Sequence, residues 1–141
     1  MKEIVFDATD CIAGRLAAIS AKELLKGNKV FIVNSEKAVI SGNPTAILNT
    51  WKAKVDRGHP YHGPFYPRQP ERILRRIIRG MLPIKKARGK QALKRLRVFV
   101  GVPEELSKST ATRLSAAIRK TKYKYITLGE LSIKLGGKRK W

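Results

Sequence analysis

The chain has 141 residues, and its charge is the first constraint on function: 31 Lys and Arg stand against 10 Asp and Glu, for a net charge of +21. This length predicts one domain, and 43% apolar residues exclude a disordered basic tail. The single cysteine, Cys11, excludes a disulfide framework and a cysteine metal site. We expect no signal peptide, no membrane span and a reducing, cytoplasmic setting.

The positive charge is concentrated after the first third of the chain. Residues 1–50 carry 6 basic and 5 acidic side chains, residues 51–100 carry 15 and 2, and residues 101–141 carry 10 and 3. A nearly neutral beginning followed by a strongly cationic remainder indicates a scaffold that carries a polyanion-binding surface.

The first forty residues predict a βαβ unit. Residues 4–6 and 30–33 are short, continuous apolar runs of the kind that forms strands buried on both faces. Residues 13–26 between them have helical periodicity, with Asp10 as a candidate N-cap and Gly27 where a helix C′ residue belongs. This order predicts parallel strands joined by a right-handed crossover.

A turn at 34–36 and a third strand at 38–40 are expected next. The helix after them is predicted at 44–55, with Asn43 as its N-cap and Pro44 at its first position.

The segment 57–69 is interrupted by Gly and Pro, which forbid regular structure. Aromatic and imidazole rings lie between these breaks with an arginine at each end: Arg57, His59, Tyr61, His62, Phe65, Tyr66 and Arg68. Rings beside arginines on a loop suit stacking on nucleic-acid bases. We therefore predict that at least one of Tyr61, Phe65 and Tyr66 contacts RNA, although pinning the loop to the core is an equally open role for each ring.

A helix at 70–82 is the element that the rest of the chain is predicted to support. Pro70 suits the first helical position, and Glu71 complements the positive end of the helix dipole. One side is an apolar stripe made of Ile73, Leu74, Ile77, Ile78, Met81 and Leu82. The other side carries Arg72, Arg75, Arg76 and Arg79.

Pro83 ends this helix, and the positive charge continues past it. The further cations are Lys85, Lys86, Arg88 and Lys90, then Lys94 and Arg95 on a short helix expected at 90–95. No acidic residue occurs between Arg72 and Gly101, whereas a solvated helix face normally mixes both signs. We therefore interpret the segment as a partner-binding surface, and expect Arg75 and Arg76 to be replaceable by Gln with the melting temperature nearly unmoved.

A strand at 98–100 is expected to complete an α/β domain that spans residues 1–103. Residues 104–141 are then a basic extension, packed on the domain or on RNA. It should contain a short helix near 111–118, a strand at 123–127, a helix opened by a capping box at Thr127 and Glu130, and a basic tip of Lys138, Arg139 and Lys140.

We find no constellation that predicts catalysis, and we expect no metal and no cofactor. A phosphate-binding glycine motif is missing from the first strand–helix connection, which contains only Gly14. Asp7 and Asp10 are explained more simply as a turn residue and a helix cap. His59 and His62 have H-x-x-H spacing, but in a Pro-rich loop that cannot place both on one helix face.

Several motifs in this order are similar to one known family. They are GRLA at 14–17, LLKG at 24–27, VFIVNSE at 30–36, SGNP at 41–44, RGMLP at 79–83 and ARGKQALKRLRVFVGVP at 87–103. Together they resemble large-subunit ribosomal protein thirteen in its archaeal form, over about residues 2–103. The resemblance implies a three-layer α/β/α fold around a four-stranded, mostly parallel sheet of order 3-2-1-4.

The resemblance also implies binding to large-subunit ribosomal RNA, a role early in subunit assembly and no catalysis. We accordingly expect neighbouring large-subunit proteins as partners, no membrane partner and no obligate homo-oligomer. A small α/β enzyme or regulator that binds a nucleotide or other anion is the alternative, supported by fold analogy alone. A membrane or calmodulin-type role for the helix at 70–82 conflicts with the need for its apolar side in the core.

The same patterns predict the core. We expect ten side chains to be almost fully buried: Ile4, Phe6, Leu24, Val30, Ile32, Leu48, Ile77, Ile78, Leu96 and Phe99.

Overall fold

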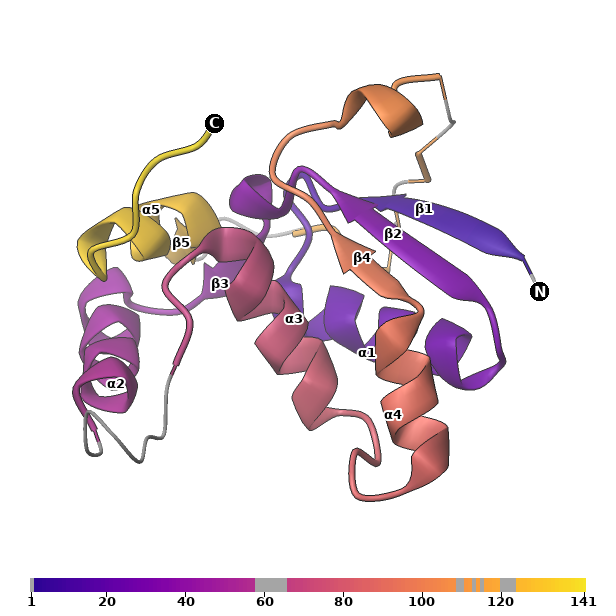
Figure 1. Ribbon diagram of the computed structural model, residues 1–141. Helices are drawn as coiled ribbons and strands as arrows, with labels where there is room; N and C mark the ends of the chain where they lie inside the picture. The colour runs from indigo at the N-terminus through magenta and orange to yellow at the C-terminus, as the bar shows by residue number, and fades with distance from the viewer. Residues whose placement is uncertain (1, 58–65, 109–110, 113, 115, 120–123) are drawn as a thin grey trace.

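The computed structural model describes residues 2–57, 66–108, 111–112, 114, 116–119 and 124–141. Figure 1 shows helices gathered beside a small sheet, with a second, smaller strand pair next to them. The elements are β1 Glu3–Asp7, α1 Ala13–Leu25, β2 Lys29–Val33, η1 Ser35–Lys37, β3 Val39–Ser41, α2 Pro44–Asp56, α3 Pro70–Gly80, α4 Ala87–Lys94, β4 Leu96–Val98, η2 Glu104–Leu106, β5 Tyr125–Thr127 and α5 Leu128–Lys134.

The α/β class and the parallel βαβ unit are confirmed. β1 and β2 pair in parallel, from Glu3 opposite Lys29 to Asp7 opposite Val33. β4 joins the sheet on the other side of β2, with Val30 opposite Leu96.

The order and number of strands differ from the expected 3-2-1-4 sheet. In the described part of the chain the parallel sheet has the order β1-β2-β4, and β3 pairs instead with β5 in an antiparallel ribbon. The outer edge of β1 is occupied by the C-terminal region, because the Asp7 amide donates to the Thr112 carbonyl at 3.0 Å and the Thr112 amide donates to the Val5 carbonyl at 2.8 Å. β4 pairs with β2 instead.

The helices that pack most closely on this sheet are α1, α3 and α4, and all three lie on one side of it (Figure 1). Val30, Ile32 and Leu96 are fully buried on this side. On the other face the Phe31 and Phe99 rings are stacked with their centroids 6.5 Å apart, and both residues are only half-buried. A third, helical layer over that face is not seen among the described residues.

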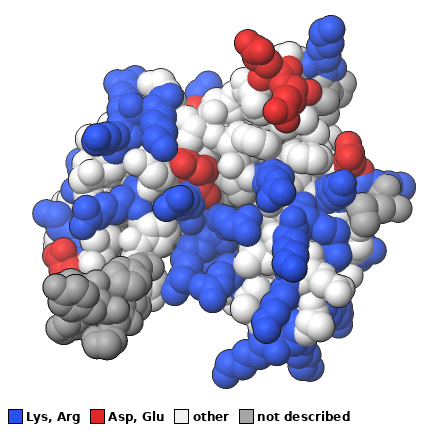
Figure 2. Space-filling model, viewed as in Figure 1, with Lys and Arg blue, Asp and Glu red and all other residues white. Residues whose placement is uncertain are grey.

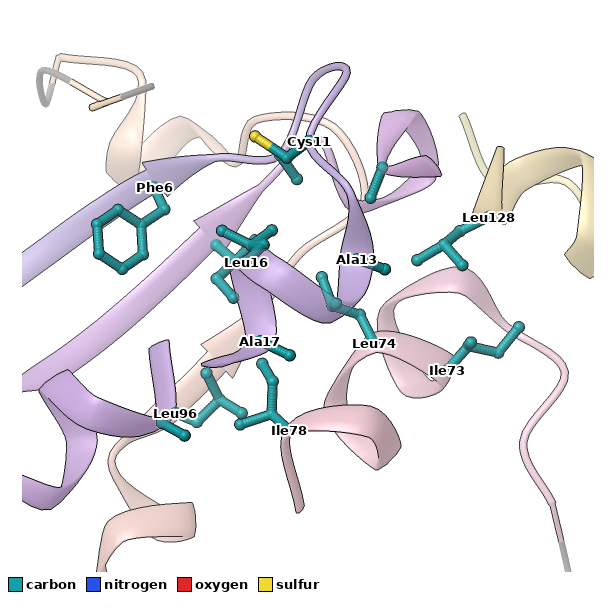
Figure 3. Close-up of a cluster of buried hydrophobic side chains, with 14 of the residues drawn as sticks. Phe6, Cys11, Ala13, Leu16, Ala17, Ile73, Leu74, Ile78, Leu96 and Leu128 are labelled. Atoms are coloured by element: carbon teal, nitrogen blue, oxygen red, sulfur yellow. The ribbon is translucent and has the colours of Figure 1, made fainter. Parts of the chain in front are cut away.

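The core lies between the sheet, α1 and α3, and the C-terminal extension contributes to it. Figure 3 shows side chains from α3 pointing toward α1 and β4, with Leu128 of α5 at the margin. Ala117, Ile126, Leu128 and Leu131 belong to the same buried cluster as the N-terminal strands. The boundary at residue 103 stays a prediction about how the chain is organised.

Six of the ten predicted core residues are buried, namely Phe6, Leu24, Val30, Ile32, Ile78 and Leu96, whereas Ile4, Leu48, Ile77 and Phe99 are only half-buried. Ile4 lies on an edge strand, and Leu48 on α2, whose only buried side chain is that of Trp51. Phe99 follows the end of β4 on the outer face. Helix α3 turns Ile73, Leu74 and Ile78 inward, so Ile77 lies at the flank and Met81 is 44% exposed.

The predicted helix starts and stops hold at most positions. The Asn43 side chain accepts from the Thr45 amide at 2.9 Å, and the Thr127 hydroxyl accepts from the Glu130 amide at 3.2 Å. Gly27 has a φ of 97°, as a left-handed C′ residue requires. Asp10 is not a cap, because the N-cap of α1 is Ile12 and Asp10 itself has a φ of 58°.

Three predicted elements after the central helix were wrong. α4 begins at Ala87 rather than at 90, and β4 spans Leu96–Val98 rather than 98–100. The described residues of 111–118 include bridges from Thr112 to Phe6 and from Ile118 to Cys11 in place of the expected short helix. These pairings depend on strands distant in sequence, which local periodicity does not report.

Candidate nucleic-acid interface

Helix α3 holds its arginines on a rigid base. Pro70 occupies the first helical position and Glu71 the first turn, as predicted. Ile73, Leu74 and Ile78 have no exposed surface, so the rotation of the helix is set by the core. Figure 2 shows Lys and Arg side chains gathered over α3 and α4.

The four arginines of α3 do not share one role. Arg72 and Arg79 are exposed, whereas Arg75 and Arg76 are half-buried. The Arg76 guanidinium lies over the Tyr66 ring, 4.9 Å from its centroid. Tyr66 therefore packs against a cation of the helix, and its contact with RNA stays a prediction.

Arg75 braces the helix against the sheet. Its Nη1 donates to the Leu96 carbonyl at 3.1 Å. Burial lowers the pKa of Arg75 from its ordinary value, and the nearby charge of Arg97 lowers that pKa further. Arg75 is thus a structural contact, and this contact argues against the expectation that Arg75 and Arg76 can be replaced together without loss of stability.

The turn after α3 is closely fitted to α4. The Ile84 amide donates to the Leu82 carbonyl and the Lys86 amide to the Pro83 carbonyl, both at 2.9 Å. Gly89 lies so close to Pro83 that an added Cβ would collide with the Pro83 carbonyl. Cations on this segment are exposed at Lys85, Lys86, Arg88, Lys90 and Lys94.

Arg95 is the exception on this segment. It is half-buried, and its Nη2 donates to the Leu24 carbonyl at the end of α1, at 2.6 Å. Arg95 therefore fixes α4 to α1, much as Arg75 fixes α3 to β4.

We call the exposed and half-exposed cations of this region the α3–α4 cationic surface; its members are Arg72, Arg76, Arg79, Lys85, Lys86, Arg88, Lys90 and Lys94. No carboxylate in the described ranges is seen within ion-pair distance of any of them, whereas an ion pair does join Glu23 of α1 to Lys26, the residue that follows this helix. No described carboxylate therefore neutralises their charge.

A groove of about 600 Å³ opens between the end of α3 and the turn that follows. Its lining consists of Arg76, Arg79, Gly80, Leu82, Pro83, Ile84, Lys85 and Lys86. The groove thus combines cations with an apolar wall, and no acidic residue is among its described lining residues.

The other predicted contact residues are distributed around the molecule. Arg57 is exposed at the end of α2, and Arg68 is exposed before α3. The exposed tip residues Lys138, Arg139 and Lys140 follow α5, which lies toward the N-terminal end of α3 and away from α4 (Figure 1). His59, Tyr61, His62 and Phe65 lie outside the described residues.

Arg97 is a candidate that the sequence interpretation missed. It is exposed at the centre of β4, close enough to Arg75 to affect its pKa. The alternation of apolar and charged residues at Leu96, Arg97 and Val98 could have indicated an exposed cation on a strand. The predicted strand began at residue 98, two residues too late to include Arg97.

The described residues hold no arrangement suited to catalysis. The Asp7 carboxylate accepts from the Thr9 amide at 3.0 Å, the Thr9 hydroxyl at 2.7 Å and the Asn34 side chain at 3.1 Å. Asp7 is the last residue of β1, and its side chain holds the connection that follows. No cluster of His, Cys, Asp and Glu there could hold a metal. No helix in the same ranges is long and apolar enough to cross a membrane.

Comparison with known proteins identifies the family. A family model described as ribosomal protein L13 matches residues 1–105. The chain is 50% identical over 137 residues to large ribosomal subunit protein uL13 of Methanosarcina barkeri, covering 95% of this chain and 98% of that protein. It is 48% identical over 136 residues to the uL13 of Archaeoglobus fulgidus, covering 94% and 86% of the two chains, and 45% identical over 142 residues to that of Methanopyrus kandleri, again covering 94% and 86%. The chain belongs to the ribosomal protein L13 family.

Proposed function

We propose that this protein is a structural constituent of the large ribosomal subunit that binds large-subunit ribosomal RNA through the α3–α4 cationic surface. The observation that carries the proposal is the charge on that surface, which no described carboxylate neutralises, on a chain whose relatives are named large-subunit proteins. The family is one of ribosomal proteins and not of enzymes, and its curated relatives are named large ribosomal subunit proteins.

The chemistry of the surface suits phosphate. The planar guanidinium of arginine can donate to two phosphate oxygens at once, and lysine adds mobile positive charge. Arg72 and Arg79 lie on the exposed side of α3, and Ile73, Leu74 and Ile78 lie on its buried side. RNA can therefore approach the arginines without disturbing the core. Contacts of this kind position a protein on RNA and carry little sequence information.

Specificity then has to come from the shape of the folded RNA and from contacts with unpaired bases. The segment 57–69 remains our proposed source of such contacts, together with Arg57 and Arg68 at its ends. The tip at Lys138, Arg139 and Lys140 is a second proposed phosphate contact, toward the N-terminal end of α3. Arg75 and Arg95, which were also predicted to contact RNA, donate to backbone carbonyls of the protein, and we propose that their part in the site is to hold the helices in place.

We further propose that the protein joins the subunit early in assembly and has other large-subunit proteins as neighbours, as the family resemblance implies. Incorporation would neutralise RNA phosphates and so favour compact RNA folds.

Copurification with ribosomes tests the proposal. Tagged protein should sediment with the large subunit at low salt and stay there at moderate salt, because many contacts form together in the assembled particle. Isolated protein bound to free ribosomal RNA should be released over the same salt range. A protein that never sediments with large subunits, or that binds the small subunit equally well, would contradict the proposal.

A further inference from the structure

The groove beside Gly80 has a composition that phosphate binding alone does not explain. Arg79, Lys85 and Lys86 line it, but so do Leu82, Pro83 and Ile84. A surface that contacts only the backbone of an RNA duplex needs cations and has no use for an apolar wall. The volume of about 600 Å³ lies within the range of roughly 300–1,000 Å³ typical of small-ligand sites.

Arg76 adds a flat surface to this wall. It lines the groove while its guanidinium lies over the Tyr66 ring at 4.9 Å. The ring packs against one face of the guanidinium and limits the orientations that it can take. Arginine planes held in this way are surfaces on which unstacked RNA bases pack.

The groove is also preformed. The turn at its far side is closed by the hydrogen bonds of Ile84 to Leu82 and of Lys86 to Pro83. Gly89 of α4 lies directly against Pro83, so the turn packs closely on α4. Leu82 is buried and anchors the turn to the core.

We propose that this groove binds a single unstacked nucleotide of ribosomal RNA. The base packs between the Arg76 guanidinium and the wall formed by Leu82, Pro83 and Ile84. The adjoining phosphates are neutralised by Arg79, Lys85 and Lys86. This inference rests on the proposed function, and it adds that the surface reads a single-stranded feature as well as phosphate.

Gly80 allows the groove to be blocked without removing any charge. It lines the groove, and a Cβ built on it meets no atom within 4 Å. Gly80→Leu therefore adds a side chain at the groove and leaves all four cations in place. Gly14→Leu is the matched control, because Gly14 is also an exposed helical glycine with nothing within 4 Å of its Cβ, and it lies on α1 outside the groove.

The measurement is binding to transcribed large-subunit ribosomal RNA over a range of salt concentrations, after thermal melts show that both variants are folded. We expect Gly80→Leu to weaken binding roughly fivefold or more, the loss expected for one base-stacking contact, with the salt slope unchanged. Gly14→Leu should bind as the parent does. A short single-stranded RNA should show the same difference between Gly80→Leu and parent, and its duplex should show none.

The contrary results are distinct. Gly80→Leu binding equal to that of the parent, or a loss confined to duplex RNA, would overturn the groove inference and leave the proposed function intact. A loss accompanied by a flatter salt slope would mean that the groove holds phosphate rather than a base, and would also overturn it. A parent protein that binds no ribosomal RNA would overturn the proposed function and this inference with it.

Discussion

Replacing Arg75 tests whether the arginines of α3 have two roles, one in stability and one in RNA binding. The Arg75 guanidinium donates to the Leu96 carbonyl at 3.1 Å and is half-buried. A hydrogen bond from a charged donor contributes about 1.5–3 kcal/mol. Partial exposure and the repulsion from Arg97 reduce that value, so we expect Arg75→Met to lower the free energy of unfolding by about 1–2 kcal/mol.

For a domain of this size such a loss corresponds to a fall in melting temperature of about 3–8 °C. The matched control is Arg79→Met, one helical turn on, where the side chain is exposed and the change should stay within about 0.5 kcal/mol. Urea unfolding followed by circular dichroism measures both variants. Equal midpoints for the two would refute the division between bracing and free arginines.

The remaining stability predictions can be checked by the same unfolding assay. Ile78→Ala should lower the free energy of unfolding by about 2–5 kcal/mol because Ile78 is fully buried. Ile77→Ala should lower it clearly less, and equal losses would mean that α3 is rotated differently. Gly89→Ala should destabilise by about 1–3 kcal/mol because its Cβ collides with the preceding turn, whereas Gly80→Ala, with open space around it, should be neutral or stabilising by up to about 1 kcal/mol. Thr127→Ala should cost about 0.5–2 kcal/mol through loss of the cap on α5, and no loss would show that the helix start is held by packing instead.

Local signals in the sequence were sufficient for most of the helices. Asn43 with Pro44, Gly27, and Thr127 with Glu130 each act within one helical turn, so they mark boundaries wherever the helix is placed. The parallel pairing of β1 with β2 could be predicted for a similar reason, because a short crossover permits few arrangements.

Pairings between distant segments could not be predicted in this way. Thr112 pairs with the outer edge of β1, and β3 pairs with β5 in a separate antiparallel ribbon. Neither contact leaves a periodic signal, and together they account for the difference from the expected sheet order. The family resemblance supplied an order of strands, but the hydrogen bonds of this chain place β4 beside β2.

The cations of the candidate site could be identified from the sequence, but the different contacts that each of them makes could not. Charge and periodicity located the arginines of α3 and the cations beyond Pro83. The same periodicity treats Arg75 and Arg79 alike, although only Arg75 reaches a strand carbonyl. The exposed Arg97 and the groove beside Gly80 depend on how β4 and the turn are placed in space.

The salt dependence of ribosomal RNA binding tests the central claim most directly. Affinity of the parent should fall by roughly 10³–10⁵ between 50 and 200 mM salt if some 6–10 phosphates are neutralised. Changing Arg72 and Arg79 together to Gln should flatten that slope by about two contacts with little change in melting temperature. Removing two exposed lysines elsewhere, Lys37 of η1 and Lys134 of α5, should leave the slope almost unaltered. If the arginine pair keeps the slope of the parent while the lysine pair flattens it, the RNA-binding surface does not lie on α3 and α4.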